Sequence, residues 1–486
     1  MDTRYENLKY LFHPGSIAFV GATETMGKWG FIIFNNLLRG GWKGRLYPVN
    51  PGRENVLGIK AYPSVKDIPD EIDLAVFTVP ARHVMASIEE CVAKGVKAGL
   101  VISAGFKETG GENVDLEAKL VAKARAGNMV LAGPNGQGLC CTSERLFPWM
   151  AQFYPRPGTV AVASQSGNVM NMLIDGVVKS GLGIAKAVSS GNEADMKIED
   201  YFQYFADDPG IDVIMSYIEG MVDGTRFKER IKNITPKKPL VVLKGGRTHF
   251  GASAASSHTG AMAVSDGLFS AMCRQYGIIQ ARTIDEGSFL AASFVGRPLP
   301  RGNRTAILTG GGGLGVIASD RCYEEGLEIV KLSDKTLDKL KKLLPDWWVP
   351  GNPVDLVAGL NPAVLMPIME ILIKSGEIDS LMLLFIIPPQ SSWDIRSHKD
   401  ARGVDMTDWK KLIIENFSVF SKELHDLSHD CNVPIYSVMN ITDQEGIRLA
   451  EKQGDKPMAI CDNIEMTCHA VGEMYRYYKF RKKREK

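Results

Sequence analysis

Residues 16–38 read SIAFVGATETMGKWGFIIFNNLL: an apolar run, a glycine-containing loop and a second apolar run. The first run, SIAFVG, is short and rich in branched and aromatic residues, which predicts a buried strand. The second run, FIIFNNLL, is typical of a helix. A strand that leads through a loop into a helix is the opening of a βαβ unit.

The same alternation continues to residue 133. Strands are predicted at GRLYPV (44–49), DLAVFTV (73–79), AGLVIS (98–103) and MVLAG (129–133), and helices at ARHVMASIEECVAK (81–94) and ENVDLEAKLVAKARA (112–126). Such a series indicates an α/β domain built on a doubly wound parallel sheet. Ligands of these sheets bind at the carboxyl ends of the strands.

The loop after the first strand does not match a dinucleotide fingerprint. Gly21, Gly27 and Gly30 lack the GxGxxG spacing, and Asn50 stands where an acid would hold a ribose hydroxyl. A nicotinamide oxidoreductase is therefore the less favoured interpretation. Arg53 instead offers a cation for a phosphate group.

A second strand–turn–helix follows at residues 159–181, TVAVASQSGNVMNMLIDGVVKSG. Ser166 and Gly167 fall at the predicted helix N-terminus, where free N–H groups favour an anion, although the residues alone favour a plain N-cap serine. A further turn, SSGNEAD (189–195), could close the same site. The strand VIMSYIEG (213–220) carries Glu219 near its end; a lone carboxylate there is usually a solvated loop residue.

Residues 244–266, KGGRTHFGASAASSHTGAMAVSD, follow the predicted strand KKPLVVLK. The segment is too rich in Gly, Ser and Ala to pack a core, and its backbone N–H groups could hold an anion. His258 lies inside it, between Ser257 and Thr259. An imidazole can act as a base or a nucleophile, but a surface loop with a solvated histidine is the alternative.

A third strand–loop–helix begins after the linker RPLPRGN (297–303), at residues 304–326. Its GxGxxG, at Gly310, Gly312 and Gly315, would suit a nucleotide, but no acid follows the next strand, LEIV. His425 and His429 have the i, i+4 spacing of metal ligands, yet the run is HDLSH rather than HExxH. A solvated helix face is favoured there, and no metal site is predicted.

Composition sets outer limits. The chain has 486 residues, 45% of them hydrophobic, and a net charge of +1, which suits roughly three domains and gives no argument for nucleic acid. No apolar run is long enough for a membrane helix, and the N-terminus does not read as a signal peptide. Eight scattered cysteines without a CxxC pair indicate reduced thiols and a cytoplasmic protein.

Several of these segments carry a family resemblance. GRTHFGASAASSHTGAMA (246–263) resembles the phosphohistidine loop of the NDP-forming acyl-CoA synthetases, relatives of succinyl-CoA synthetase, and above all of the α subunit of ADP-forming acetyl-CoA synthetases. GATETMGKWG, VNPGR, Val79–Pro80, SAGF and GPN resemble the CoA-binding loops of that family, in the same order. One departure is Val264, where the family usually has glycine.

The resemblance, from about Ile17 to Val471, implies a Rossmann-like CoA-binding domain (1–140) followed by two flavodoxin-like parallel-sheet domains (141–298, with the phosphohistidine, and 299–486). It implies that His258 carries a phosphoryl group and that Glu219 hydrogen-bonds this histidine. The phosphate-binding residues would be Ser166, Gly167, Gly191, Asn192, Ser257 and Thr259. CoA would be held by Gly21, Ala22, Thr23, Met26, Gly27, Lys28, Asn50, Pro51, Arg53, Val79, Pro80, Ser103, Gly105, Asn135 and Gly136.

The implied activity is the reversible conversion of acyl-CoA, phosphate and ADP or GDP into free acid, CoA and ATP or GTP, through an acyl phosphate and a phosphohistidine. No segment resembles the ATP-grasp domain that holds nucleotide and Mg²⁺ in this family. A separate β subunit is therefore expected, in an αβ or α₂β₂ assembly. The alternative is a catalytically silent CoA- or acyl-CoA-binding regulatory protein.

The acyl group is the least defined feature. The family often has cysteine after GPN, where this chain has Gly136 followed by Gln137. A glycine there could let a ligand approach the backbone. The aromatic stretch LFPWMAQFY (146–154) could line an apolar pocket, although core packing explains it as well. The functional interpretation predicts an acyl group bulkier than acetyl.

Overall fold

The computed structural model describes residues 3–253, 265–356, 362–385, 422–439 and 460–485. These form two compact units, which are described separately. The first comprises residues 1–175 and 183–287, and the second comprises residues 176–182 and 288–486. The predicted division into three domains is finer than this and stays a prediction.

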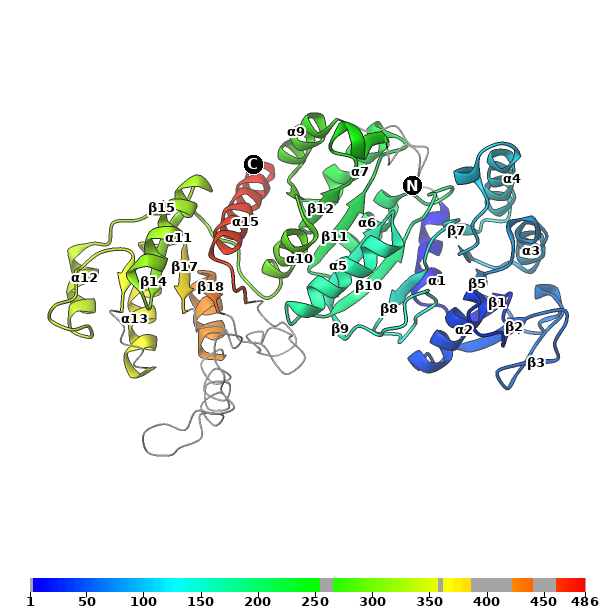
Figure 1. The fold of residues 1–486 in the computed structure, drawn as a ribbon, viewed down its shortest axis with the longest axis horizontal. Coiled ribbons are helices and arrows are strands. Elements are labelled where there is room, and N and C mark those ends of the chain that lie inside the picture. The colour runs from blue at the N-terminus through cyan, green and yellow to red at the C-terminus, as the bar shows by residue number, and fades with distance from the viewer. Residues whose placement is uncertain (1–2, 254–264, 357–361, 386–421, 440–459, 486) are drawn as a thin grey trace. The chain divides into compact units, whose positions relative to one another are not determined.

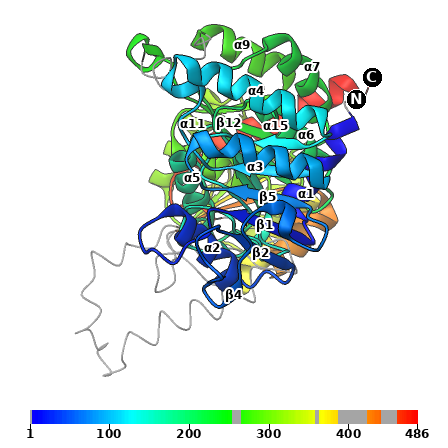
Figure 2. The ribbon, with the colours of Figure 1, turned by 90° about the vertical axis from the view of Figure 1, so that its right-hand side faces the viewer.

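The first sheet of the first unit has the strand order β2-β1-β5-β6-β7, and every neighbouring pair is parallel. The strands are β1 (Ser16–Val20), β2 (Arg45–Val49), β5 (Leu74–Phe77), β6 (Ala98–Val101) and β7 (Val130–Ala132). The helices between them are α2 (Trp29–Gly40), α3 (Ala81–Lys94) and α4 (Glu112–Ala126), and α3 and α4 lie side by side (Figures 1 and 2). The predicted doubly wound sheet is confirmed.

Strand β1 shows why these strands are continuously apolar. Ile17 and Phe19 belong to one core cluster, with residues of α2, whereas Ala18 and Val20 belong to another, with residues of α3 and α4. Successive side chains of a strand point to opposite faces, so a sheet covered by helices on both faces buries every residue of its central strands.

The second sheet has the order β13-β12-β11-β9-β10-β8. Its parallel strands are β9 (Pro157–Ser164), β10 (Ile184–Ser189), β11 (Val213–Ile218), β12 (Leu240–Lys244) and β13 (Ile278–Ala281). The edge strand β8 (Leu139–Cys141) is antiparallel to β10 and was not predicted. The helices are α5 (Gly167–Lys179), α6 (Ile198–Asp207), α7 (Gly224–Ile234), α9 (Asp266–Tyr276) and α10 (Ile284–Ser293). The division between the two units falls within α5 and within α10.

The second unit holds a parallel sheet of order β15-β14-β17-β18, with β16 paired to β14. Its strands are β14 (Arg304–Thr309), β15 (Glu328–Ile329), β16 (Val354–Asp355), β17 (Ser380–Leu384) and β18 (Ile435–Val438). Its other helices include α11 (Gly312–Glu324), α12 (Asp334–Lys341), α13 (Pro362–Lys374) and α15 (Ile464–Arg484). The long polar stretch at residues 387–408, which the sequence predicts to be a surface loop, lies outside the described residues.

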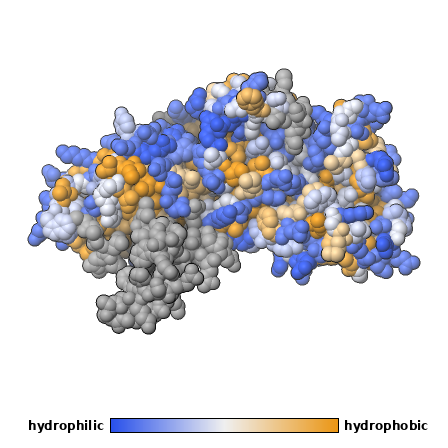
Figure 3. Space-filling model, in the orientation of Figure 1, coloured by the Kyte–Doolittle hydropathy of each residue, from blue (hydrophilic) through white to orange (hydrophobic). Residues whose placement is uncertain are grey.

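Three further properties concern the surface, the cysteines and the helices. An apolar area lies near α11 on the face drawn in Figure 3, where Val316 and Ile317 are exposed. All eight cysteines are free. Among the described helices, none combines the length and apolarity that a bilayer crossing requires.

Candidate functional site

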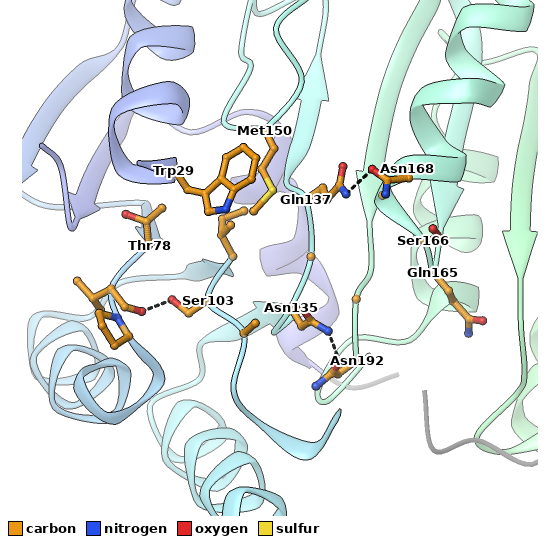
Figure 4. A pocket seen from close by; sticks show the side chains of 17 residues that line it. Trp29, Thr78, Ser103, Asn135, Gln137, Met150, Gln165, Ser166, Asn168 and Asn192 are labelled. Atoms are coloured by element: carbon orange, nitrogen blue, oxygen red, sulfur yellow. Dashed lines mark hydrogen bonds between the residues drawn. The ribbon is translucent and has the colours of Figure 1, made fainter. Parts of the chain in front are cut away.

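The carboxyl ends of strands from both sheets of the first unit border one cavity of about 530 Å³ (Figure 4). Its position follows from the parallel topology, because the loops after parallel strands gather at one edge of a sheet. The lining residues are Trp29, Thr78, Val79, Pro80, Ile102, Ser103, Ala104, Asn135, Gly136, Gln137, Met150, Gln165, Ser166, Gly167, Asn168, Gly191 and Asn192.

Five of the predicted CoA-binding residues line this cavity: Val79, Pro80, Ser103, Asn135 and Gly136. The loops after β5 and β6 are joined there, because the Ser103 hydroxyl donates to the carbonyl oxygen of Val79 at 2.5 Å. This bond fixes the turn that presents Val79 and Pro80 to the cavity.

The other predicted CoA-binding residues are not among the lining residues: Gly21, Ala22, Thr23, Met26, Gly27, Lys28, Asn50, Pro51, Arg53 and Gly105. The Asn50 amide has a structural task, since Nδ2 donates to the Ala22 carbonyl at 2.8 Å and Oδ1 accepts from the Gly52 N–H at 2.9 Å. It joins the loops after β1 and β2. Arg53 is exposed beside them.

Four predicted phosphate-binding residues, Ser166, Gly167, Gly191 and Asn192, line the opposite part of the cavity. Gly167 is the first residue of α5, and the first N–H groups of a helix have no intrahelical acceptor. Together with the positive end of the helix dipole, these groups favour an anion. The structure therefore brings the predicted phosphate residues and part of the predicted CoA residues to one cavity.

Sequence reasoning missed the polar pair that packs on the start of α5. Gln137 Nε2 donates to Asn168 Oδ1 at 2.8 Å (Figure 4). A Cβ built on Gly167 would lie 2.2 Å from Cγ of Gln137, so the glycine makes room for that side chain. The only sequence signal was the position of Gln137, two residues after the GPN motif.

Gly136 lies close to the end of β10 as well as at the cavity. A Cβ built there would lie 2.6 Å from the carbonyl oxygen of Ser189, so the glycine makes room for that strand end. Its expected role in CoA binding stays a prediction. In the aromatic stretch, Phe147 and Trp149 are buried in core packing, and Met150 lines the cavity. The preference for a bulky acyl group stays a prediction.

Glu219 follows the last residue of β11 and is 7% exposed. Gln165, after β9, holds its backbone: Oε1 accepts from the N–H groups of Glu219 at 2.6 Å and Gly220 at 3.2 Å, and Nε2 donates to the Gly220 carbonyl at 2.9 Å. The Glu219 carboxylate also hydrogen-bonds Tyr217, and burial together with this carboxylate raises the pKa of Tyr217 to about 12.

Glu193 is a buried carboxyl in the loop after β10 and was not singled out from the sequence. Burial is the main cause that raises the pKa of Glu193 from 4.5 to about 7. The hydrogen bond from Ser190 opposes this rise, and the nearby Glu199 charge adds to it. Its φ of +55° is a left-handed conformation that is uncommon for a non-glycine residue. The Lys197 ammonium secures the turn by donating to the carbonyls of Glu193 and Ala194.

Ser257, His258 and Thr259 lie outside the described residues. The strand before them, β12, and the helix after them, α9, both belong to the first unit. Within the part of the chain that the structure describes, no three His, Cys, Asp or Glu side chains are grouped as metal ligands.

Comparison with known families divides the chain in three. Residues 15–141 match the family described as a CoA binding domain. Residues 157–294 match the succinyl-CoA ligase like flavodoxin domain, and residues 305–399 match the Ligase-CoA domain.

Individual proteins resemble nearly the whole chain. The chain is 37% identical over 435 residues to the ADP-forming acetate–CoA ligase II subunit alpha of Pyrococcus furiosus, covering 88% of this chain and 94% of that one. It is 32% identical over 396 residues to a trans-feruloyl-CoA synthase from an unknown prokaryote, covering 79% and 56%. A solved acetyl-coenzyme A synthetase 1 of Candidatus Korarchaeum cryptofilum, in complex with phosphate and ADP, superimposes with a TM-score of 0.83 at 30% identity, covering 98% and 97%.

Proposed function

Since the chain belongs to the NDP-forming acyl-CoA synthetase family, we propose that it is the α subunit of an enzyme converting acyl-CoA, phosphate and ADP reversibly into free acid, CoA and ATP. The observation that carries the proposal is the shared cavity. Loops of the CoA-binding type and loops suited to an anion line the same space of about 530 Å³.

This shared cavity suits the first step of the reaction. A phosphate oxygen attacks the thioester carbonyl, the carbon–sulfur bond breaks, and CoA leaves as a thiolate that takes up a proton. Phosphate held by N–H groups at the start of α5, near Gly167, would face a thioester whose pantetheine arm runs past Val79 and Ser103. Positioning of the two reactants supplies much of the rate enhancement in such a step.

The second step moves the phosphoryl group to the protein. A ring nitrogen of His258 attacks phosphorus and the carboxylate of the acid leaves; a terminal phosphate oxygen of ADP then takes the phosphoryl group from the histidine. Glu219 would accept a hydrogen bond from the other ring nitrogen, which fixes the tautomer and supports the cationic phosphohistidine. The bonds from Gln165 to the Glu219–Gly220 backbone support this role, because they hold the residue in place.

Nucleotide and Mg²⁺ would be held by a partner chain of the ATP-grasp type, in an αβ or α₂β₂ assembly. The name of the Pyrococcus furiosus relative, a subunit alpha, supports a multi-subunit enzyme. We place the enzyme in the cytoplasm, since its eight free cysteines suit a reducing compartment.

Labelled phosphate tests the function. The chain is incubated with acyl-CoA, labelled phosphate and ADP, with and without candidate ATP-grasp partners. We expect labelled ATP only when a partner is present. A chain that binds CoA but releases no CoA from acyl-CoA with any partner would support the regulatory alternative instead.

A further inference from the structure

One carboxylate touches both groups of loops that border the cavity. Glu108 lies in the short turn that follows the loop after β6, the loop that contains Ser103 and Gly105. Its Oε1 accepts from the N–H groups of Gly105 at 2.6 Å and Phe106 at 3.2 Å. Its Oε2 accepts from the amide Nδ2 of Asn192, in the loop after β10, at 2.5 Å.

A second carboxylate completes the arrangement. Glu117 Oε2, from α4, accepts from the same Asn192 Nδ2 at 2.9 Å and from the Lys107 N–H at 3.3 Å. Asn192 Oδ1 in turn accepts from Asn135 Nδ2 at 3.2 Å (Figure 4). Both hydrogens of the Asn192 amide are thus directed to carboxylates, because an amide nitrogen has only two to donate.

This geometry changes the task of Asn192. Its side-chain donors are engaged by the two carboxylates, and its backbone N–H donates to the Pro134 carbonyl at 2.9 Å. The amide of Asn192 therefore serves to fix the loop that contains Gly191 rather than to donate to phosphate. Two carboxylates beside an anion site repel phosphate, so a direct contact with it is not their role. Their use here is to gather the N–H groups of residues 105–107 and the Asn192 amide.

We propose that Glu108 is a positioning residue that couples CoA binding to phosphate binding, by tying the loop after β6 to the loop after β10. The proposal rests on the proposed function. CoA bound against Ser103 would fix the loop after β6. This loop positions Glu108 through the Gly105 N–H, and Glu108 positions Asn192 in the loop that would bind phosphate. Each ligand therefore strengthens the binding of the other by the same factor, as thermodynamic linkage requires.

Glu108→Gln removes this coupling with little change of shape. A carboxylate accepts at both oxygens, whereas a glutamine accepts at one and presents an NH₂ at the other. If its oxygen keeps the Gly105 N–H, its NH₂ faces the NH₂ of Asn192. Although burial raises the pKa of Glu108, the hydrogen bonds from Asn192 and Gly105 lower it below the ordinary value, so the wild-type residue is the charged double acceptor at neutral pH.

Calorimetry on the full chain tests the proposal. The affinity for CoA is measured without and with saturating inorganic phosphate, and the affinity for phosphate without and with CoA. In the wild type we expect each ligand to tighten the other about 5- to 100-fold, the usual range for coupled sites. In Glu108→Gln we expect almost no coupling, so that each ligand changes the affinity for the other by less than about twofold. The affinity for CoA in the absence of phosphate should change less than about threefold. Glu112→Gln, an exposed acid at the start of α4, is the matched control and should keep the wild-type factor.

Three results would count against the proposal. An unchanged coupling factor in Glu108→Gln overturns it, and so does a wild type in which the two ligands bind independently. A wild type that binds neither ligand overturns the proposed function itself. If Glu108→Gln fails to fold, Asn192→Ala removes the other end of the same bond and should also abolish the coupling; retained coupling there refutes the proposal.

Discussion

At the scale of single residues, the side chains around the cavity have two different roles. Some would contact ligands, and others hold the loops in place. Gln165 uses both ends of its amide on the backbone after β11, and Asn50 uses both ends of its amide between two loops. Partly buried amides of this kind cost free energy when a partner is removed. Substitutions at such positions therefore affect geometry, whereas substitutions at His258 and Glu219 test chemistry.

His258→Asn should abolish the acid-labile, base-stable protein label that forms from acyl-CoA and labelled phosphate, because no ring nitrogen remains to accept the phosphoryl group. CoA binding should be unchanged. His249→Asn, an exposed histidine nine residues earlier, is the control and should label normally. Wild-type labelling of the His258 variant would remove this residue from the mechanism.

Glu219→Gln should slow histidine phosphorylation about ten- to a hundredfold, as for other residues that orient a histidine. The backbone bonds from Gln165 do not involve the substituted side chain, so CoA affinity should not change. Single-turnover labelling in a rapid-quench instrument measures the rate. An unchanged rate would exclude Glu219 as the partner of the histidine.

Glu193→Gln should stabilise the protein above neutral pH. The folded pKa of Glu193, about 7, exceeds its ordinary value of 4.5, so the folded state binds more protons between these values and loses stability as pH rises through them. At about 1.4 kcal/mol per pKa unit, the variant should gain up to about 3 kcal/mol over the wild type by pH 8 and nothing at pH 4. Denaturant unfolding across this pH range measures the difference, and a constant difference would contradict the shifted pKa.

At the scale of secondary structure, the start of α5 depends on a residue that lies far from it in the sequence. Gln137, which follows the GPN loop, occupies the space that a side chain on Gly167 would need. The helix N-terminus can therefore approach the loop after β7, and the N–H groups proposed to hold phosphate lie at the same cavity as the loops proposed to hold CoA. The location of these N–H groups at the cavity therefore depends on where α5 is packed, and not on the helix propensity of its residues.

Gly167→Ala should lower both stability and phosphate affinity, since the new methyl group meets Cβ, Cγ and Cδ of Gln137. Overpacking of this kind costs about 1–3 kcal/mol. Gly267→Ala, in the first turn of α9 with nothing within 4 Å of the built Cβ, is the control and should be neutral or slightly stabilising. Equal effects in the two variants, by denaturant unfolding and calorimetry, would contradict the packing argument.

At the scale of the whole chain, the two compact units differ in what they hold. All residues that line the cavity belong to the first unit. The second unit has its own sheet and its own core around β14 and β17. A ligand of the cavity should therefore stabilise the first unit.

CoA at 100 times its dissociation constant should stabilise the unit that binds it by about 2.7 kcal/mol. Hydrogen exchange of the full chain measures this effect. CoA should slow the exchange of those amides of β1 and β9 that exchange only when the unit unfolds, and it should leave the exchange rates of β14 and β17 unchanged. Omission of CoA gives the reference. Equal protection of both units would show that they unfold together or that CoA binds elsewhere.

The sequence alone predicted most strands and helices of the first unit and the order of the loops after them. Apolar periodicity is a local property, so β1, α3 and β9 could be read from their own residues. The parallel arrangement then followed from the alternation of strand and helix, and it placed the loops at one edge of each sheet. The family motifs added the chemistry expected of these loops.

Tertiary structure alone decided which of these loops meet. Asn192 and Glu108 are 84 positions apart, and Gly136 is a glycine because the end of β10 approaches it. The edge strand β8 owes its direction to pairing with β10. Such contacts depend on how the two sheets are placed relative to each other. A local sequence pattern cannot predict them, because each of the contacting residues is by itself an ordinary polar or small residue.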